Sequence, residues 1–249
     1  MVHPLDGARL KIERTWELLE ALNGEIRAFV DTEPYGYWIE PEPDSDWMLV
    51  RVEVRRRIPS HLSLLFGDAV HDCRSALNHL AYEMAAIGSG PSRSTQWPIY
   101  KTPDDWRVHH TRHLAGIDPA YWAAIERLQP YQDPANLDWL FRLKELDDAD
   151  KHRQLHVAQV APSARDLIFD PPVVEVEELP AGIYMEDGTV VARMRTTAAV
   201  PHVTVQMSFG LGFLFGTGQW GGTPRDVVQF GHGVNALLTQ FEKNAFPRS

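Results

Sequence analysis

The sequence predicts an α+β fold, in which helices dominate the first part of the chain and an antiparallel, β-rich region precedes a closing helix. Apolar residues recur at helical spacing over long stretches before residue 156. Short β-rich runs split by Pro and Gly come next, and Thr223-Pro224 then opens a final helix. We therefore expect a helical region at 1–156, with a β-hairpin inserted at 37–57, and a β-rich region plus the closing helix at 157–249, packed as one compact unit.

The first helix is predicted over residues 5–31. Its apolar positions recur at helical spacing: Leu5, Ile12, Trp16, Leu19, Ile26 and Phe29. Pro34 and Gly36 end this helix. Apolar and charged residues then alternate from Leu49 to Arg55, as in a strand, which predicts the hairpin at 37–57.

The most regular helix is predicted at 60–87, after Pro59. One of its faces is uniformly apolar: Leu62, Phe66, Ala69, Cys73, Ala76, Leu80 and Met84. We expect these side chains to be buried together. Shorter helices are predicted at 103–115, 118–129 and 136–154, where Asp118-Pro119 supplies an N-cap followed by proline.

After His156 the periodicity changes to that of strands. The β-rich runs are 156–160, 166–170, 172–178, 182–185, 189–195 and 202–215. Glu186-Asp187-Gly188 predicts a hairpin turn. The closing helix is predicted to run from Thr223 to about Phe246.

The composition limits the class of protein. A chain of 249 residues can bury a hydrophobic core. It has no apolar run of membrane-spanning length, and its first residues do not resemble a secretory signal. Its one cysteine, Cys73, fits a reducing compartment, so we expect a cytoplasmic protein. A net charge of −10 opposes non-specific binding of nucleic acid, although it leaves room for a local basic patch.

The polar side of the 60–87 helix carries two stripes at helical spacing. The first is Asp68, Asp72, Ser75, His79 and Glu83, and the second is His71, Arg74, Asn78 and Tyr82. A solvated helix face is usually rich in Lys and Glu, whereas these stripes hold short polar groups and histidines, which are mediocre helix formers. Either a functional site or a buried polar network would explain this choice of residues.

The segment Arg74-Ser-Ala-Leu-Asn-His79 places a histidine after an arginine and four intervening residues on one helix. It resembles the signature of the HEPN superfamily, helical-bundle proteins that include metal-independent ribonucleases and non-catalytic relatives. The resemblance implies a homodimer that brings Arg and His from two subunits together, RNA as the partner, and no metal or cofactor. His79 would activate a ribose 2′-hydroxyl and Arg74 would stabilise charge on the phosphate. The family often has an amide or acidic side chain directly after the Arg, where Ser75 stands here, and Asn78 or Asp72 would take its place.

A second cluster follows at the end of the 136–154 helix. It comprises Asp147, Asp148, Asp150, Lys151, His152 and Arg153. We expect it to face the polar stripes, because Arg74, His71 and His79 need acidic or amide partners if they are partly buried. The candidate substrate-binding residues are His71, Ser75, Asp150, His152 and Arg153. The simpler interpretation is a charged helix terminus, with cations against the helix dipole.

A third patch contains mostly basic and imidazole side chains. It comprises Lys101, Arg107, His109, His110, Arg112 and His113. Together with Arg51 and Arg55–Arg57 it would form a phosphate-binding surface. Solvated helix faces are the alternative.

Three classes of function fit these residues, and the sequence leaves open whether the protein is an enzyme. The first is a HEPN-like RNA-binding protein or metal-independent ribonuclease, with an intact or a degenerate site. The second is a non-enzymatic interaction or regulatory protein whose polar helix forms a structural network. The third is a metal-dependent hydrolase with ligands such as Asp68, Asp72, His79 and Asp150, which suit Mn, Fe or Zn. Access to Arg74 and His79 separates the first class from the second.

Overall fold

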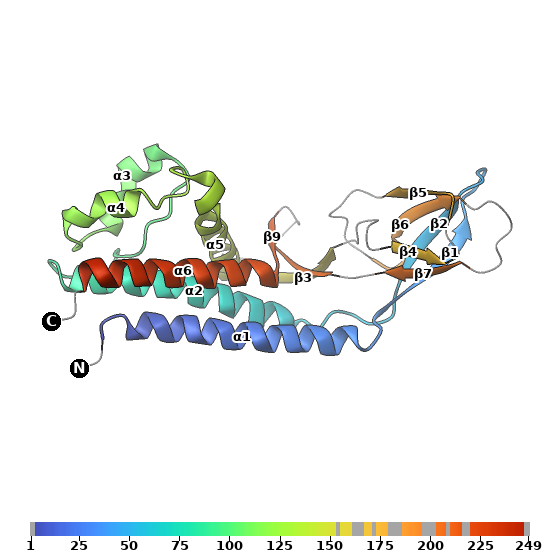
Figure 1. The fold of residues 1–249 in the computed structure, drawn as a ribbon, viewed down its shortest axis with the longest axis horizontal. Coiled ribbons are helices and arrows are strands. Elements are labelled where there is room, and N and C mark those ends of the chain that lie inside the picture. The colour runs from blue at the N-terminus through green and yellow to red at the C-terminus, as the bar shows by residue number, and fades with distance from the viewer. Residues whose placement is uncertain are drawn as a thin grey trace. The chain divides into compact units, whose positions relative to one another are not determined.

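The computed structural model describes residues 3–152, 155–160, 167–170, 173–178, 186–195, 203–207, 210–215 and 220–246 (Figure 1). The fold is α+β, as the sequence predicts. The chain divides into two compact units. The helical unit comprises Met1–Asn23, Ser63–Leu155 and Phe215–Ser249, and the β unit comprises Gly24–Leu62 and His156–Leu214. The inserted hairpin thus belongs with the later strands, and the closing helix belongs with the earlier helices.

The helices have the following bounds: α1 (Asp6–Val30), α2 (His61–Ala86), α3 (Pro103–His113), α4 (Trp122–Glu126), α5 (Pro134–His152) and α6 (Pro224–Ala245). The long helices agree closely with the predicted ranges. The helix expected at 118–129 is shorter, since a 3-10 turn at Pro119–Tyr121 precedes α4. Pro130 disfavours helical geometry at the residue before it, so α4 does not continue.

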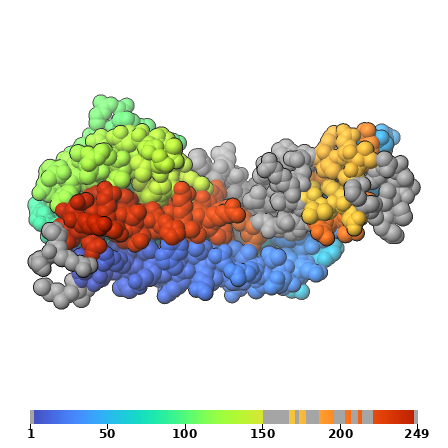
Figure 2. Space-filling view, in the orientation of Figure 1, coloured from blue at the N-terminus to red at the C-terminus, as the bar shows by residue number. Residues whose placement is uncertain are grey.

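The apolar face of α2 is buried as predicted. Its members are Leu62, Phe66, Ala69, Cys73, Ala76, Leu80 and Met84, each at most 2% exposed. Helix α6 approaches α1 closely in the helical unit: a Cβ on Gly231 would lie 2.6 Å from the Trp16 ring, so glycine permits this contact. The space-filling view shows α6 running between α1 and the residues of α3 to α5 on one face (Figure 2).

The start of α6 is fixed by a capping box. The backbone N–H of Thr223 donates to Asp226 Oδ2 at 2.7 Å, and the Thr223 hydroxyl contacts the same oxygen at 3.0 Å. Arg142 of α5 pairs with Asp226 Oδ1 at 2.8 Å. One carboxylate therefore both caps α6 and joins it to α5.

The β unit contains a sheet with strand order β1-β2-β6-β5. Its strands are β1 (Tyr35–Pro41), β2 (Met48–Val54), β5 (Glu175–Glu178) and β6 (Val190–Arg195), each antiparallel to its neighbour. Val50 lies opposite Ala192, and both are fully buried. The predicted turn before β6 is present: the N–H of Thr189 donates to the Glu186 carbonyl at 3.0 Å, and Gly188 has a φ of +83°.

The remaining strands are β3 (Leu155–Val160), β4 (Leu167–Asp170), β7 (Thr204–Met207), β8 (Gly210–Phe215) and β9 (Trp220–Gly222). β4 and β7 pair antiparallel. The N–H of Val205 in β7 donates to the hydroxyl of Tyr37 in β1 at 2.9 Å, which links this ribbon to the larger sheet. The strand predicted at 182–185 lies outside the described residues. Within the described part of the chain, no helix is long and apolar enough to span a membrane.

Candidate functional site

Arg74 lies inside the helical unit. Only 7% of the residue is exposed, and its Nη2 donates to the backbone carbonyl of Trp97 at 2.9 Å. Its Nη1 has no hydrogen-bond partner among the described residues. Burial lowers the pKa of the guanidinium, and the negative charges of Asp147 and Asp148 oppose that shift. Arg74 is therefore a buried cation held by a backbone carbonyl and by nearby acids.

Asn78, one turn further along α2, holds the same segment. Its Oδ1 accepts a hydrogen bond from the backbone N–H of Trp97 at 3.2 Å. Gln129, which follows α4, accepts from the N–H of Tyr100 at 3.0 Å and donates to the carbonyls of Pro98 and Ile125, each at 3.1 Å. Three side chains thus satisfy backbone groups along 97–100, where no strand lies alongside.

These bonds give Arg74 and Asn78 a structural role. The segment they hold carries the side chain of Trp97, which is fully buried and packs edge-on against Phe241 of α6 with ring centroids 5.4 Å apart. Buried backbone groups need partners, and here side chains of α2 supply them. Two of the four residues of the second polar stripe, Arg74 and Asn78, therefore hold an extended segment in the core.

His79 lies on another side of α2. It is exposed, and its ring lies against α1, where a Cβ on Gly7 would be 3.3 Å from His79 Nδ1. Five residues of helix turn through about 140° net, so His79 and Arg74 diverge. Within one chain, the structure does not bring the two residues of the Arg-x4-His motif together. The dimer that the resemblance implies stays a prediction.

Asp72 faces α1 as well. It is 4% exposed, and its carboxylate accepts from Lys11 Nζ at 2.7 Å and lies 3.5 Å from Arg14 Nε. The buried carboxylate is thus compensated by two cations of α1, which leaves it ill-suited to assist catalysis or to bind a metal. Among the described residues, no three His, Cys, Asp or Glu side chains are grouped to hold a metal ion.

The predicted contact between α2 and the acidic segment of α5 is confirmed for one pair. His71 Nδ1 lies 2.8 Å from Asp147 Oδ1, with the imidazole half-exposed and the carboxylate buried. Ser75, one turn after His71, is half-buried and makes no hydrogen bond to a described side chain. The side chains of Asp150 and His152, and all of Arg153, lie outside the described residues.

The third patch contains a hydrogen-bonded group of side chains that was not predicted from the sequence. The hydroxyl of Tyr100 lies 2.6 Å from His113 Nδ1, and His113 Nε2 lies 3.0 Å from Gln96 Nε2. Burial raises the pKa of Tyr100 to about 12 and lowers the pKa of His113, which the positive charges of Arg112 and Arg74 lower further. The phenol and the imidazole therefore meet as neutral groups at neutral pH.

Other residues of this patch have separate contacts. His110 Nδ1 lies 2.7 Å from the backbone carbonyl oxygen of Trp106, and the imidazole of His110 stacks on the Trp106 ring. Arg107 pairs with Asp104. Lys101 lies over the ring of Phe141, with Nζ 4.6 Å from its centroid. The patch is thus partly committed to contacts within the helical unit.

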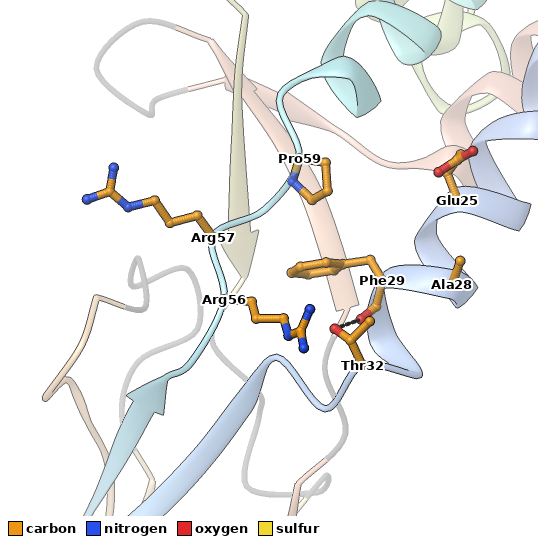
Figure 3. A pocket seen from close by; sticks show the side chains of 7 residues that line it. All are labelled: Glu25, Ala28, Phe29, Thr32, Arg56, Arg57 and Pro59. Atoms are coloured by element: carbon orange, nitrogen blue, oxygen red, sulfur yellow. Dashed lines mark hydrogen bonds between the residues drawn. The ribbon is translucent and has the colours of Figure 1, made fainter.

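The β unit contains an open pocket of about 520 Å³. Its lining residues are Glu25, Ala28, Phe29, Thr32, Arg56, Arg57 and Pro59 (Figure 3). Arg56 points toward Thr32 and Phe29, whereas Arg57 extends to the other side of the chain (Figure 3). Neither guanidinium pairs with an acid among the described residues. Glu25 Oε2 lies 3.4 Å from His61 Nε2. The pocket is mixed in charge, which favours no one ligand class.

Comparison of this chain with known proteins identifies no family. No family model, curated protein or solved structure matches this chain. The arguments about function therefore depend on the contacts described above.

Sequence reasoning missed Gln129 and the Tyr100–His113 pair. A signal was present in Trp97-Pro98-Ile99-Tyr100, where apolar residues surround a proline that cannot donate a backbone hydrogen bond. Such a segment predicts an apolar anchor for a loop. The identity of the side chains that hold it depends on how α2 and α4 pack.

Proposed function

We propose that this chain is a non-enzymatic interaction protein in which the polar residues of α2 stabilise the helical unit. The observation that carries the proposal is the pair of hydrogen bonds from α2 to one residue: Arg74 Nη2 donates to the carbonyl of Trp97, and Asn78 Oδ1 accepts from its N–H. A guanidinium that is buried and committed to a backbone carbonyl is poorly placed to stabilise charge on a phosphate from solvent.

The ribonuclease alternative needs Arg74 and His79 at one phosphate. His79 is exposed and fits that requirement, whereas Arg74 is buried on a different side of the helix. RNA as a bound partner, without cleavage, is compatible with the proposal.

The test compares Arg74→Ala with His79→Ala. The first variant should lower the free energy of unfolding by about 2–5 kcal/mol, since it removes a buried side chain and leaves the Trp97 carbonyl without its donor. The second should change it by less than about 0.5 kcal/mol. Urea denaturation followed by circular dichroism measures both.

The same preparations are then incubated with single-stranded RNA without added metal. Wild type and His79→Ala should leave the RNA intact. Cleavage by the wild type that disappears in the folded His79→Ala variant would establish the ribonuclease function and overturn the proposal.

A further inference from the structure

The ring of Tyr100 lies beside two imidazoles of α3. His113 is nearly parallel to it, with centroids 5.8 Å apart and an interplanar angle of 4°, and the centroid of His109 is 6.2 Å away. The hydrogen bond between Tyr100 and His113 fixes both rings. Tyr100 and His113 are therefore held in place, and contact groups that are already held bind a ligand at a smaller entropic cost.

Two side chains beside these rings carry donors that no acid in the described part of the chain occupies. Arg112 is exposed, and among the described residues its Nε donates a hydrogen bond to Ser94 Oγ at 3.3 Å. His109 is exposed and forms no hydrogen bond or ion pair with a described residue. They lie three positions apart on α3 and share a face of the helix.

The acids of α3 are engaged elsewhere. Asp104 pairs with Arg107, and Asp105 accepts a hydrogen bond from the Thr102 hydroxyl at 2.6 Å at the start of the helix. Both Arg107 and Arg112 lie on α3, but among the described residues Arg107 is paired with an acid and Arg112 is not. This contrast supplies a matched control.

Charges of both signs act on the two rings, and positive charges act on His113. After burial, the cations Arg112 and Arg74 lower the pKa of His113. Asp105 acts on the other member of the pair, where it raises the pKa of Tyr100. A positive potential that disfavours a proton on His113 favours an anion beside it.

We propose that the cluster formed by Tyr100, His109, Arg112 and His113, the Tyr100 site, binds a phosphate group. The guanidinium of Arg112 supplies paired N–H donors that match phosphate oxygens, and His109 supplies a further N–H. The exposed ring of His109 provides a surface for stacking of an attached base. The Tyr100 site depends on the proposed non-enzymatic function in one respect: the protein binds the ligand and releases it chemically unchanged.

The test titrates full-length protein, labelled with ¹⁵N on histidine, with inorganic phosphate, a mononucleotide and a short oligoribonucleotide in separate arms. Binding should shift the imidazole signals of His109 and His113 and raise the pKa of His113, because a bound anion opposes the cationic neighbours. Arg112→Ala should weaken binding about tenfold or more, from the loss of charge-assisted hydrogen bonds. Arg107→Ala removes the same charge from α3 and should bind nearly as wild type.

Each arm has a defined meaning. Saturation by inorganic phosphate assigns the site to the phosphate ion. Saturation by the mononucleotide but not by inorganic phosphate assigns it to a nucleotide, and saturation only by the oligoribonucleotide assigns it to a nucleic-acid backbone. No shift at His109 or His113 in any arm, or equal weakening by Arg112→Ala and Arg107→Ala, would overturn the Tyr100 site. Cleavage of the oligoribonucleotide, followed on a gel, would instead contradict the non-enzymatic function while leaving the binding site intact.

Discussion

The hydroxyl of Tyr100 and Nδ1 of His113 lie 2.6 Å apart and join the 97–100 segment to the end of α3. A second contact supports the first, since the backbone N–H of Gln96 donates to the carbonyl of His113 at 3.1 Å. Protonation of His113 on both ring nitrogens would remove an acceptor from this arrangement. The attachment of α3 therefore depends on a neutral imidazole.

Stability should fall on acidification because of His113. Burial lowers its pKa in the folded protein below the ordinary value of 6.5, so the unfolded chain binds more protons from about pH 6.5 downward. The free energy of unfolding then rises with pH across that range and falls as pH drops through it. Urea denaturation at pH 5 and pH 7 should show a smaller difference for His113→Asn than for wild type. His79→Asn, on another helix, should keep the wild-type difference, and equal differences for all three proteins would count against this role of His113.

Gln129→Ala should destabilise the helical unit. The substitution leaves the N–H of Tyr100 and the carbonyl of Pro98 without their partner in a buried setting. Each unsatisfied group costs about 1–3 kcal/mol, so a loss of about 2–6 kcal/mol is expected in urea denaturation. Gln229→Ala, at an exposed position of α6, should remain close to wild type. A loss below 1 kcal/mol at position 129 would mean that water replaces the amide.

Leu80→Ala should remove about 2–5 kcal/mol of stability, because the Leu80 side chain is fully buried on the apolar face of α2. Leu64→Ala, on the same helix at a residue that is 68% exposed, should change stability little. Thermal and urea unfolding measure both variants. Similar losses for the two would contradict the assignment of faces on α2.

Tyr37→Phe should loosen the link between β1 and β7. The buried N–H of Val205 would lose its acceptor, at a cost of about 1–3 kcal/mol. Amide exchange at Val205 should accelerate in the variant, which nuclear magnetic resonance detects at that one residue. Tyr82→Phe removes a hydroxyl from a residue that is 52% exposed and serves as the control. Unchanged exchange at Val205 would show that this hydrogen bond contributes little.

The faces of α2 were predictable because the spacing of its apolar residues alone determines which side is buried. Likewise, alternation around Val50 was sufficient to predict the β1–β2 hairpin. The grouping of that hairpin with β6 was not predictable, since the pairing of Val50 with Ala192 joins segments that are distant in sequence. Local patterns indicate an element and its buried side but do not select its partner.

The candidate site shows the same limit at the level of single residues. The sequence marked Arg74 and His79 as one motif, yet the path of the chain gives Arg74 a carbonyl partner at Trp97 and leaves His79 in contact with α1. The expectation that histidines of α2 find acids on α5 was correct for His71 and Asp147. The sequence shows that acidic side chains are present to compensate buried cations. Which cation becomes buried depends on how the helices pack.

The segment from Trp97 to Tyr100 resembles a strand whose neighbours have been replaced by side chains. Its backbone partners come from Arg74 and Asn78 on one helix and from Gln129 after another, so the segment is held only while both helices are in place. Opening either helix exposes amides that the other cannot protect. α2 and α4, with the stretch between them, should therefore open as a single foldon.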